Sequence, residues 1–172
     1  MSDLKRYEEA IVKYHSDLRI KSVPVLSLEF YYQYIKELKE SLVDFRNLKG
    51  LAFKNKWEMS PDWNIDTPIK EEVIIVTDAK LSIVFASRNM IKMNGYVAAD
   101  VLGKSPKMFQ GEVTDRVISS EINTAIQLRQ AFEKTVLNYK KNGEIYACLI
   151  KGYPIFNIKG ELIHYIAFEK AA

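Results

Sequence analysis

The chain has 172 residues, with 25 lysines and arginines against 22 aspartates and glutamates, 48% hydrophobic residues and a single cysteine. A chain of this length can bury a full hydrophobic core, and its ordinary apolar and charged fractions exclude wholesale disorder. One cysteine excludes an intramolecular disulfide and a cysteine-based zinc site, which fits a reducing compartment. No apolar run approaches the roughly 20 residues of a membrane span, and the first residues lack a secretory-type apolar stretch. We therefore expect a cytoplasmic protein without a membrane partner.

The charge is spread evenly along the chain. Residues 1–66 are neutral overall, and residues 67–172 carry the whole net charge of +3. Neither part contains a basic run of the kind that binds phosphate backbones. Nucleic acid is therefore not an expected partner.

Residues 1–56 predict an N-terminal helical extension. Between residues 3 and 18, apolar side chains recur every three or four positions, as they do on one face of a helix. A break that contains Pro24 follows, and a second, longer helix is expected from Leu28 to Lys54 with Ser27 as its N-cap. The apolar stripe of this helix can pack against its own domain or against a second copy of the chain, and the sequence leaves both open.

Residues 57–72 contain two prolines and two tryptophans and predict a linker. The hydrophobic periodicity changes after this stretch. Short β-rich and helical runs follow. Strands are expected over 73–77, 81–85, 132–139, 145–155 and 162–169, and helices over 88–94, 98–102 and 114–129. This order predicts an α+β domain over residues 73–170, with a five-stranded antiparallel sheet and helices on one face.

Several motifs in this domain carry a family resemblance. The sharpest is Gly103–Gly111, "GKSPKMFQG", followed by Thr114-Asp115, and a second is Asn138-Tyr139 ahead of the turn at Asn142-Gly143. Together with "VIIVTD", "IVFAS", "MNGY" and "GELIHYIAFE", they resemble a PAS domain, more narrowly its light-oxygen-voltage (LOV) branch. The resemblance covers about residues 73–169 and implies the PAS fold and a sensory role.

The resemblance also implies where a flavin would sit. LOV domains are photoreceptors because a cysteine in the first motif bonds to excited flavin, but the matching residue here is Pro106, which has no nucleophile. The positions equivalent to the flavin pocket are Ser105, Lys107, Gln110, Asn123, Asn138, Cys148 and Glu169.

Most of these positions depart from the family pattern. Of three amide side chains that the family places on its last strands, Asn138 is retained, while Cys148 and Glu169 replace the other two. Lys107 and Asn123 replace two arginines that hold the phosphate, so one cation remains without a guanidinium fork. Ser105 stands for another family asparagine, and Gln110 matches. Since each unpaired buried polar group costs about 1–3 kcal/mol, we interpret the pocket as vestigial and expect no cofactor, with FMN as the alternative.

Simpler structural roles compete for the retained residues. Gln110 and Asn138 can be explained as holding loop and strand backbone together, and Glu169 as a solvated residue near the end of the final strand. Cys148 can be explained as a small core residue with an inert thiol.

No catalytic motif appears. The sequence contains no nucleophile with a base, histidine pair, phosphate-binding glycine loop or metal-ligand spacing, and "GKS" at 103–105 lacks the first glycine of a P-loop, because that position is Ala98. We therefore expect no enzyme but a stand-alone sensory or regulatory module without flavin photochemistry. It would act through protein contacts, as a homodimer that an unidentified signalling partner reads.

Two alternatives stay open at this point. One is a flavin-binding, LOV-like photoreceptor that signals without a cysteinyl adduct. The other is a ligand-free dimerisation domain, in which bulky residues would fill the pocket: Met108, Phe109, Tyr146 and Phe168.

Overall fold

The computed structural model describes residues 25–58 and 71–172 of the chain, which divides into two units, Met1–Glu37 and Leu38–Ala172. Helix α2 (Val25–Lys54) passes through the boundary between them. Because α2 already includes Val25, Ser27 lies inside the helix and is not its N-cap as predicted. The first predicted helix, residues 3–18, lies outside the described residues.

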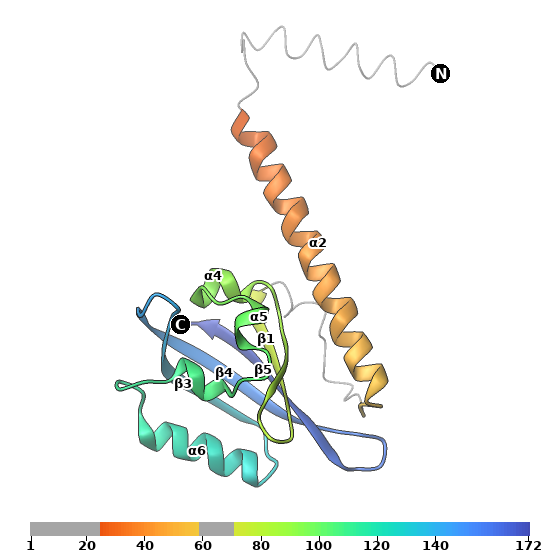
Figure 1. The fold of residues 1–172 in the computed structure, drawn as a ribbon, viewed down its shortest axis with the longest axis vertical. Coiled ribbons are helices and arrows are strands. Elements are labelled where there is room, and N and C mark those ends of the chain that lie inside the picture. The colour runs from red at the N-terminus through yellow and green to blue at the C-terminus, as the bar shows by residue number, and fades with distance from the viewer. Residues whose placement is uncertain (1–24, 59–70) are drawn as a thin grey trace, which may run out of the picture. The chain divides into compact units, whose positions relative to one another are not determined.

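A five-stranded antiparallel sheet forms the centre of the second unit (Figure 1). Its strands lie in the order β2-β1-β5-β4-β3. Their bounds are β1 (Val73–Asp78), β2 (Ile83–Ala86), β3 (Phe132–Tyr139), β4 (Ile145–Phe156) and β5 (Leu162–Ala171). The predicted α+β fold and sheet are confirmed, with small shifts at the strand ends.

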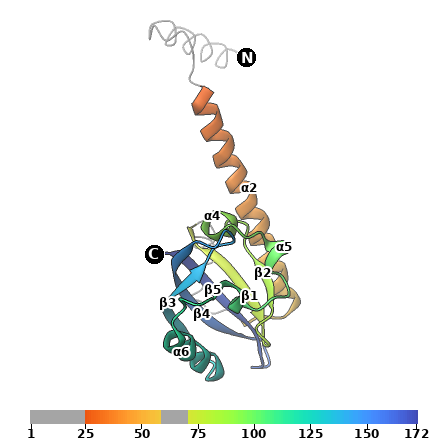
Figure 2. The same cartoon turned by 60° about the vertical axis from the view of Figure 1, so that its left-hand side comes forward.

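Four short helical elements follow β2 and lead to β3. They are α4 (Met90–Asn94), α5 (Ala98–Val101), the 3-10 helix η1 (Pro106–Phe109) and α6 (Arg116–Gln127), and α6 lies beside β3 in both views (Figures 1 and 2). The first three bury Met90, Val101 and Phe109 against the inner face of β1 and β2. The sequence did not predict η1. Its proline stands at the start of the element, and the Ser105 hydroxyl accepts a hydrogen bond from the Lys107 amide at 3.4 Å.

The end of α2 packs on the opposite, outer face of the sheet. Leu48 is 1% exposed and lies in a core cluster with residues of β1, β2, β4 and β5: Ile74, Val76, Phe85, Ile155, Ile166 and Phe168. Phe45, Leu51 and Ala52 pack around this cluster. The carboxylate of Asp44 also accepts a hydrogen bond from the Arg88 amide at 2.7 Å. This part of α2 therefore packs on its own domain, one of the two possibilities that the sequence left open.

Trp57 belongs to the same outer core, although we placed it in the linker. Its indole nitrogen donates a hydrogen bond to Nδ1 of His164 at 3.1 Å, and both side chains are buried. Burial lowers the pKa of His164, which keeps the ring neutral and able to accept this bond. Residues 59–70 of the predicted linker lie outside the described residues.

Side-chain alternation along the strands separates the two faces of the sheet. On β1, Ile74 and Val76 face the end of α2, whereas Ile75 faces the short helices and Thr77 lines the cavity described below. The same alternation on β5 sends Ile166 to the outer core. The inner face of the sheet is therefore the face that borders the cavity, whereas the end of α2 covers the outer face.

Leu48→Ala should lower the free energy of unfolding by about 2–5 kcal/mol, because it leaves a cavity under α2. Leu42→Ala is the matched control on the same helix, since Leu42 is 58% exposed, and it should change the free energy by less than about 0.5 kcal/mol. Urea unfolding measures both values. Equal effects of the two substitutions would contradict the packing of α2 on the sheet.

Candidate functional site

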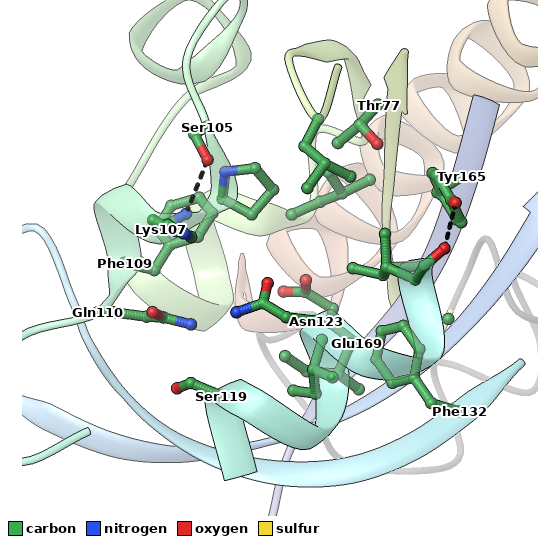
Figure 3. A pocket seen from close by; sticks show the side chains of 18 of the residues that line it. Thr77, Ser105, Lys107, Phe109, Gln110, Ser119, Asn123, Phe132, Tyr165 and Glu169 are labelled. Carbon is green, nitrogen blue, oxygen red and sulfur yellow. Dashed lines mark hydrogen bonds between the residues drawn. The ribbon is translucent and has the colours of Figure 1, made fainter. Parts of the chain in front are cut away.

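A cavity of about 240 Å³ lies between the inner face of the sheet, η1 and α6. Figure 3 shows the side chains of Gln110, Asn123 and Glu169 pointing into the same space from a loop, a helix and a strand. The cavity is lined by Ile75, Thr77, Leu81, Ser105, Pro106, Lys107, Phe109, Gln110, Ser119, Ile122, Asn123, Ile126, Phe132, Asn138, Ile150, Gly152, Tyr165, Ile166, Ala167 and Glu169.

The floor of the cavity is a row of four residues that the strand register places side by side. Ile75 pairs with Ala167, Ala167 with Gly152, and Gly152 with Phe132. The two central residues carry little or no side chain, so the strands themselves put little volume on the middle of the inner face. A Cβ on Gly152 would collide with the ring of Phe132, which shows that this ring lies directly over the glycine.

The loop from Gln110 to Asp115 is held to β3. The Thr114 hydroxyl donates to the carbonyl of Leu137 at 2.7 Å and accepts from the Gly111 amide at 3.0 Å. The ring of Tyr139 lies so close to Gly111 that a Cβ there would collide with it. Gly111 and Thr114 of the first motif therefore have a structural role: they fix the path of the chain beside Gln110.

Helix α6 forms the roof of the cavity. Asp115 caps its first turn by accepting from the Val117 amide at 2.6 Å, and the Tyr165 hydroxyl donates to the carbonyl of Ile126 at 2.7 Å near its end. No side chain of α6 is fully buried. The reason is that its apolar face, with Ile122 and Ile126, borders the cavity and not a packed layer.

The structure brings six of the seven sequence-predicted site residues to the cavity: Ser105, Lys107, Gln110, Asn123, Asn138 and Glu169. Cys148 is fully buried and does not line it; its thiol lies beside Glu169, with Sγ 3.7 Å from Oε2. The sequence did not single out Thr77, Ser119 or Tyr165. For Thr77 a signal existed, because it follows Val73 and Ile75 at the two-residue period of one strand face.

Two polar atoms at this cavity have no hydrogen-bond partner within the described part of the chain: Oγ1 of Thr77 and Oδ1 of Asn138. The two residues are 5% and 3% exposed. Buried polar groups in folded proteins are almost always paired, so such atoms call for a partner that is not part of the protein. The simpler role for Asn138, which is to hold backbone groups together, does not apply to this oxygen, because it accepts no hydrogen bond from a described residue.

Glu169 is buried in β5 and is 4% exposed, so the interpretation of a solvated side chain is wrong. Its strand partners are Val73 on one side and Ile150 on the other. Burial raises the pKa of Glu169 to about 7, and the Cys148 thiol donates a hydrogen bond to its Oε2. Burial and the nearby Glu169 both raise the pKa of that thiol, which therefore stays protonated.

The bulky residues that the ligand-free alternative expected in the pocket do not fill it. Phe109 forms one wall of the cavity, and Met108 packs beside the inner core. Phe168 lies in the outer core under α2. The cavity therefore stays open, whereas the ligand-free alternative expected a collapsed core at this place.

Residues 25–58 and 71–172 contain neither a metal-binding cluster nor a membrane-spanning helix. No group of three or more histidine, cysteine, aspartate or glutamate side chains there could hold a metal ion. No helix in these ranges has the length and apolarity needed to cross a bilayer.

Residues 71–170 match the profile of the PAS domain family, which is more than half of the chain. The chain belongs to the PAS domain family. The sheet order, the cavity under α6 and the motif around Gln110 are thus parts of one PAS domain.

Relatives of this PAS domain include sensory proteins of bacteria and plants. A nitrogen fixation regulatory protein of Klebsiella oxytoca is 30% identical over 97 residues, 56% of this chain and 20% of that protein. The protein TWIN LOV 1 of Arabidopsis thaliana is 35% identical over 98 residues, 55% of this chain and 25% of that protein. A blue-light-activated histidine kinase of Brucella abortus is 33% identical over 87 residues, 51% of this chain and 18% of that protein. The chain thus spans a quarter or less of the length of these relatives.

Solved structures of LOV domains have the same fold. The dark structure of the blue-light photoreceptor Aureochrome1 LOV matches with a TM-score of 0.60 and 25% identity, over 66% of this chain and 86% of that one. A LOV domain studied with a flavin analogue matches with a TM-score of 0.59 and 19% identity, over 64% of this chain and 86% of that one. The PAS domain of this chain is LOV-like.

The expectation of no cofactor is wrong. The relatives and solved structures that the domain resembles include LOV domains, one of them studied with a flavin analogue. The geometry agrees with this correction, because six positions that we interpreted as vestigial line an open cavity with two unpaired polar atoms.

Thr77→Val should raise the free energy of unfolding of the ligand-free PAS domain by about 1–3 kcal/mol, because it removes an unpaired buried hydroxyl and keeps the shape of the side chain. Thr135→Val on the exposed face of β3 is the control and should have little effect. Urea unfolding in the absence of ligand gives both values. A loss of stability in Thr77→Val would mean that the hydroxyl is paired.

Proposed function

We propose that this PAS domain is a flavin-binding, LOV-like sensory module that signals without a cysteinyl adduct. The observation that carries the proposal is the cavity under α6, where the buried Oδ1 of Asn138 has no partner within the described residues. The relatives add weight, since they include a LOV protein and a blue-light-activated histidine kinase. The role is sensory and not catalytic.

The residues at the cavity fit the demands of a flavin ring. The polar edge of such a ring presents both donors and acceptors, and the cavity offers an amide oxygen on Asn138, a hydroxyl on Thr77 and an amide on Gln110. Ile122 and Ile126 supply an apolar wall for its faces. When bound, a flavin supplies the absorption of blue light and the acceptance of electrons.

The phosphate of FMN would meet a weaker site. Lys107 is the one cationic residue among those that line the cavity, and it is exposed on η1. Asn123 adds an uncharged amide from α6. A single exposed ammonium holds a phosphate without the two parallel hydrogen bonds of a guanidinium.

The absence of an adduct is part of the proposal and follows from two positions. Pro106 lines the cavity at the start of η1, where LOV photoreceptors carry their cysteine, and a proline ring offers no nucleophile. Cys148, the single cysteine of the chain, is buried outside the set of lining residues. Its thiol also stays protonated, whereas attack requires a thiolate.

The module would pass its signal through contacts with other proteins. We keep a homodimer, an unidentified signalling partner and a cytoplasmic location as parts of the proposal. Three exposed tyrosines on α2 support a protein contact there, since Tyr31, Tyr32 and Tyr34 are each more than half exposed.

Ala167→Leu should weaken FMN binding by at least about tenfold, because the added side chain enters the floor of the cavity. Ala147→Leu on the outer face of β4 is the matched control and should bind like the wild type. Fluorescence quenching of added FMN measures both affinities. A colourless wild-type protein that fails to bind added FMN would remove the proposal.

Cys148→Ser should leave any light-driven change in the visible spectrum of the FMN-loaded protein unaltered, in both size and recovery. The physical reason is that the thiol is protonated and lies outside the cavity lining. Absorption spectra before and after blue illumination provide the measurement. A light response that disappears in this variant would show that the thiol takes part.

A further inference from the structure

Glu169 is a carboxyl group at the cavity wall without a cationic partner. It forms no salt bridge with any described residue, and its neighbours across the sheet are the apolar Val73 and Ile150. Lys107, the one cation among the lining residues, is exposed on η1. In Figure 3 the carboxyl group of Glu169 points into the cavity from β5.

The groups that face Glu169 from the other elements do not favour a negative charge. On β4, Tyr146 and Cys148 are both buried, and burial raises the pKa of each. On β3, the Lys134 ammonium is 2.6 Å from the carboxylate of Glu121 on α6, which satisfies its charge. On α6 the lining residues carry no charge; they are Ser119, Ile122, Asn123 and Ile126.

A buried carboxyl group in such surroundings keeps its proton. An ionised carboxylate without a counter-charge is costly in an apolar interior, and the usual response is neutralisation. Burial accordingly raises the pKa of Glu169 to about 7. Since the thiol of Cys148 donates to Oε2, the other carboxyl oxygen remains available to carry the proton toward the cavity.

We propose that Glu169 acts as a neutral carboxylic acid that donates a hydrogen bond to an acceptor on the ring of the bound flavin, so that flavin affinity depends on one proton held by this side chain. The inference rests on the proposed function and adds a regulation to it. A glutamine at this position would donate at every pH, whereas Glu169 stops donating when it ionises and then turns a negative charge toward the acceptor. The site therefore binds flavin most tightly at acidic pH, and its affinity falls as Glu169 ionises with rising pH.

Riboflavin binding as a function of pH tests the proposal. Riboflavin is the chosen probe because it lacks the phosphate, whose own second pKa near 6 would confuse the profile. The wild type should bind riboflavin about tenfold more weakly at pH 8 than at pH 6, as expected for one required proton with a pKa of about 7. Glu169→Gln keeps a donor without a titration and should bind equally well at both values. Fluorescence quenching gives the affinities.

A second measurement needs no ligand. The pKa of Glu169 in the folded protein, about 7, lies above its ordinary value of 4.5, so the folded state binds more protons than the unfolded state between these values. His164, whose pKa burial lowers, and Asp44, whose pKa burial raises, also contribute to the pH dependence of stability, equally in the wild type and in Glu169→Gln. The urea midpoint of the wild type should therefore fall relative to that of Glu169→Gln as the pH rises from about 4.5 to about 7.

The outcomes separate the two proposals. Riboflavin binding that is independent of pH in the wild type would overturn the role of Glu169 and leave the flavin site in place. A pH-dependent affinity that persists in Glu169→Gln would do the same, since the titrating group would then lie elsewhere. Failure of both proteins to bind riboflavin at any pH would overturn the proposed function itself, and the role of Glu169 with it.

Discussion

The site depends on missing side-chain volume in the middle of the inner sheet face. Protein interiors are packed as densely as organic crystals, so a place with little side chain must be filled by a neighbour or stay open. Here Ala167 and Gly152 stand side by side at the centre of one row, between Ile75 and Phe132 at its ends. Hydrogen bonds from β5 to the end of α6 and from Thr114 to β3 fix the approach of the roof. The cavity is thus a property of the register of four strands.

In the proposed function, the polar atoms at this cavity serve the flavin at the expense of the stability of the free domain. A core built only for stability would carry apolar groups at Thr77 and Asn138, since an unpaired buried polar group costs about 1–3 kcal/mol. Two of the three family amides are replaced in this chain, by Cys148 and Glu169. The replacement by Glu169 is not a loss of hydrogen bonding, because a buried carboxylic acid, like an amide, offers both a donor and an acceptor. In the role proposed for it, Glu169 changes the conditions under which the site binds flavin and does not remove the site.

Local patterns in the sequence predicted most of the fold, because strands and helices follow from periodicities of two and of three to four residues. These local patterns did not predict features that depend on contacts between residues far apart in the sequence. Trp57 reads as part of a linker, yet it bonds to His164, 107 positions along the chain. Element η1 is a single 3-10 turn, and no periodicity in the sequence indicated it. Six cavity residues were found through family motifs, whereas Ser119 and Tyr165 became visible only once the register and the helix rotation were known.

The element most sensitive to the contents of the cavity is α6. Helices in proteins gain most of their stability from packing an apolar face, and the inner face of α6 has the cavity in place of a packed layer. Among the described residues, the polar links of α6 to the sheet are one hydrogen bond from Tyr165 and an ion pair between Glu121 and Lys134, which is partly exposed and therefore weak. Tyr165 and Glu169 lie on the same face of β5. A flavin held by Glu169 as proposed would therefore complete the packing of Ile122 and Ile126, and occupancy of the site and the stability of α6 would rise and fall together.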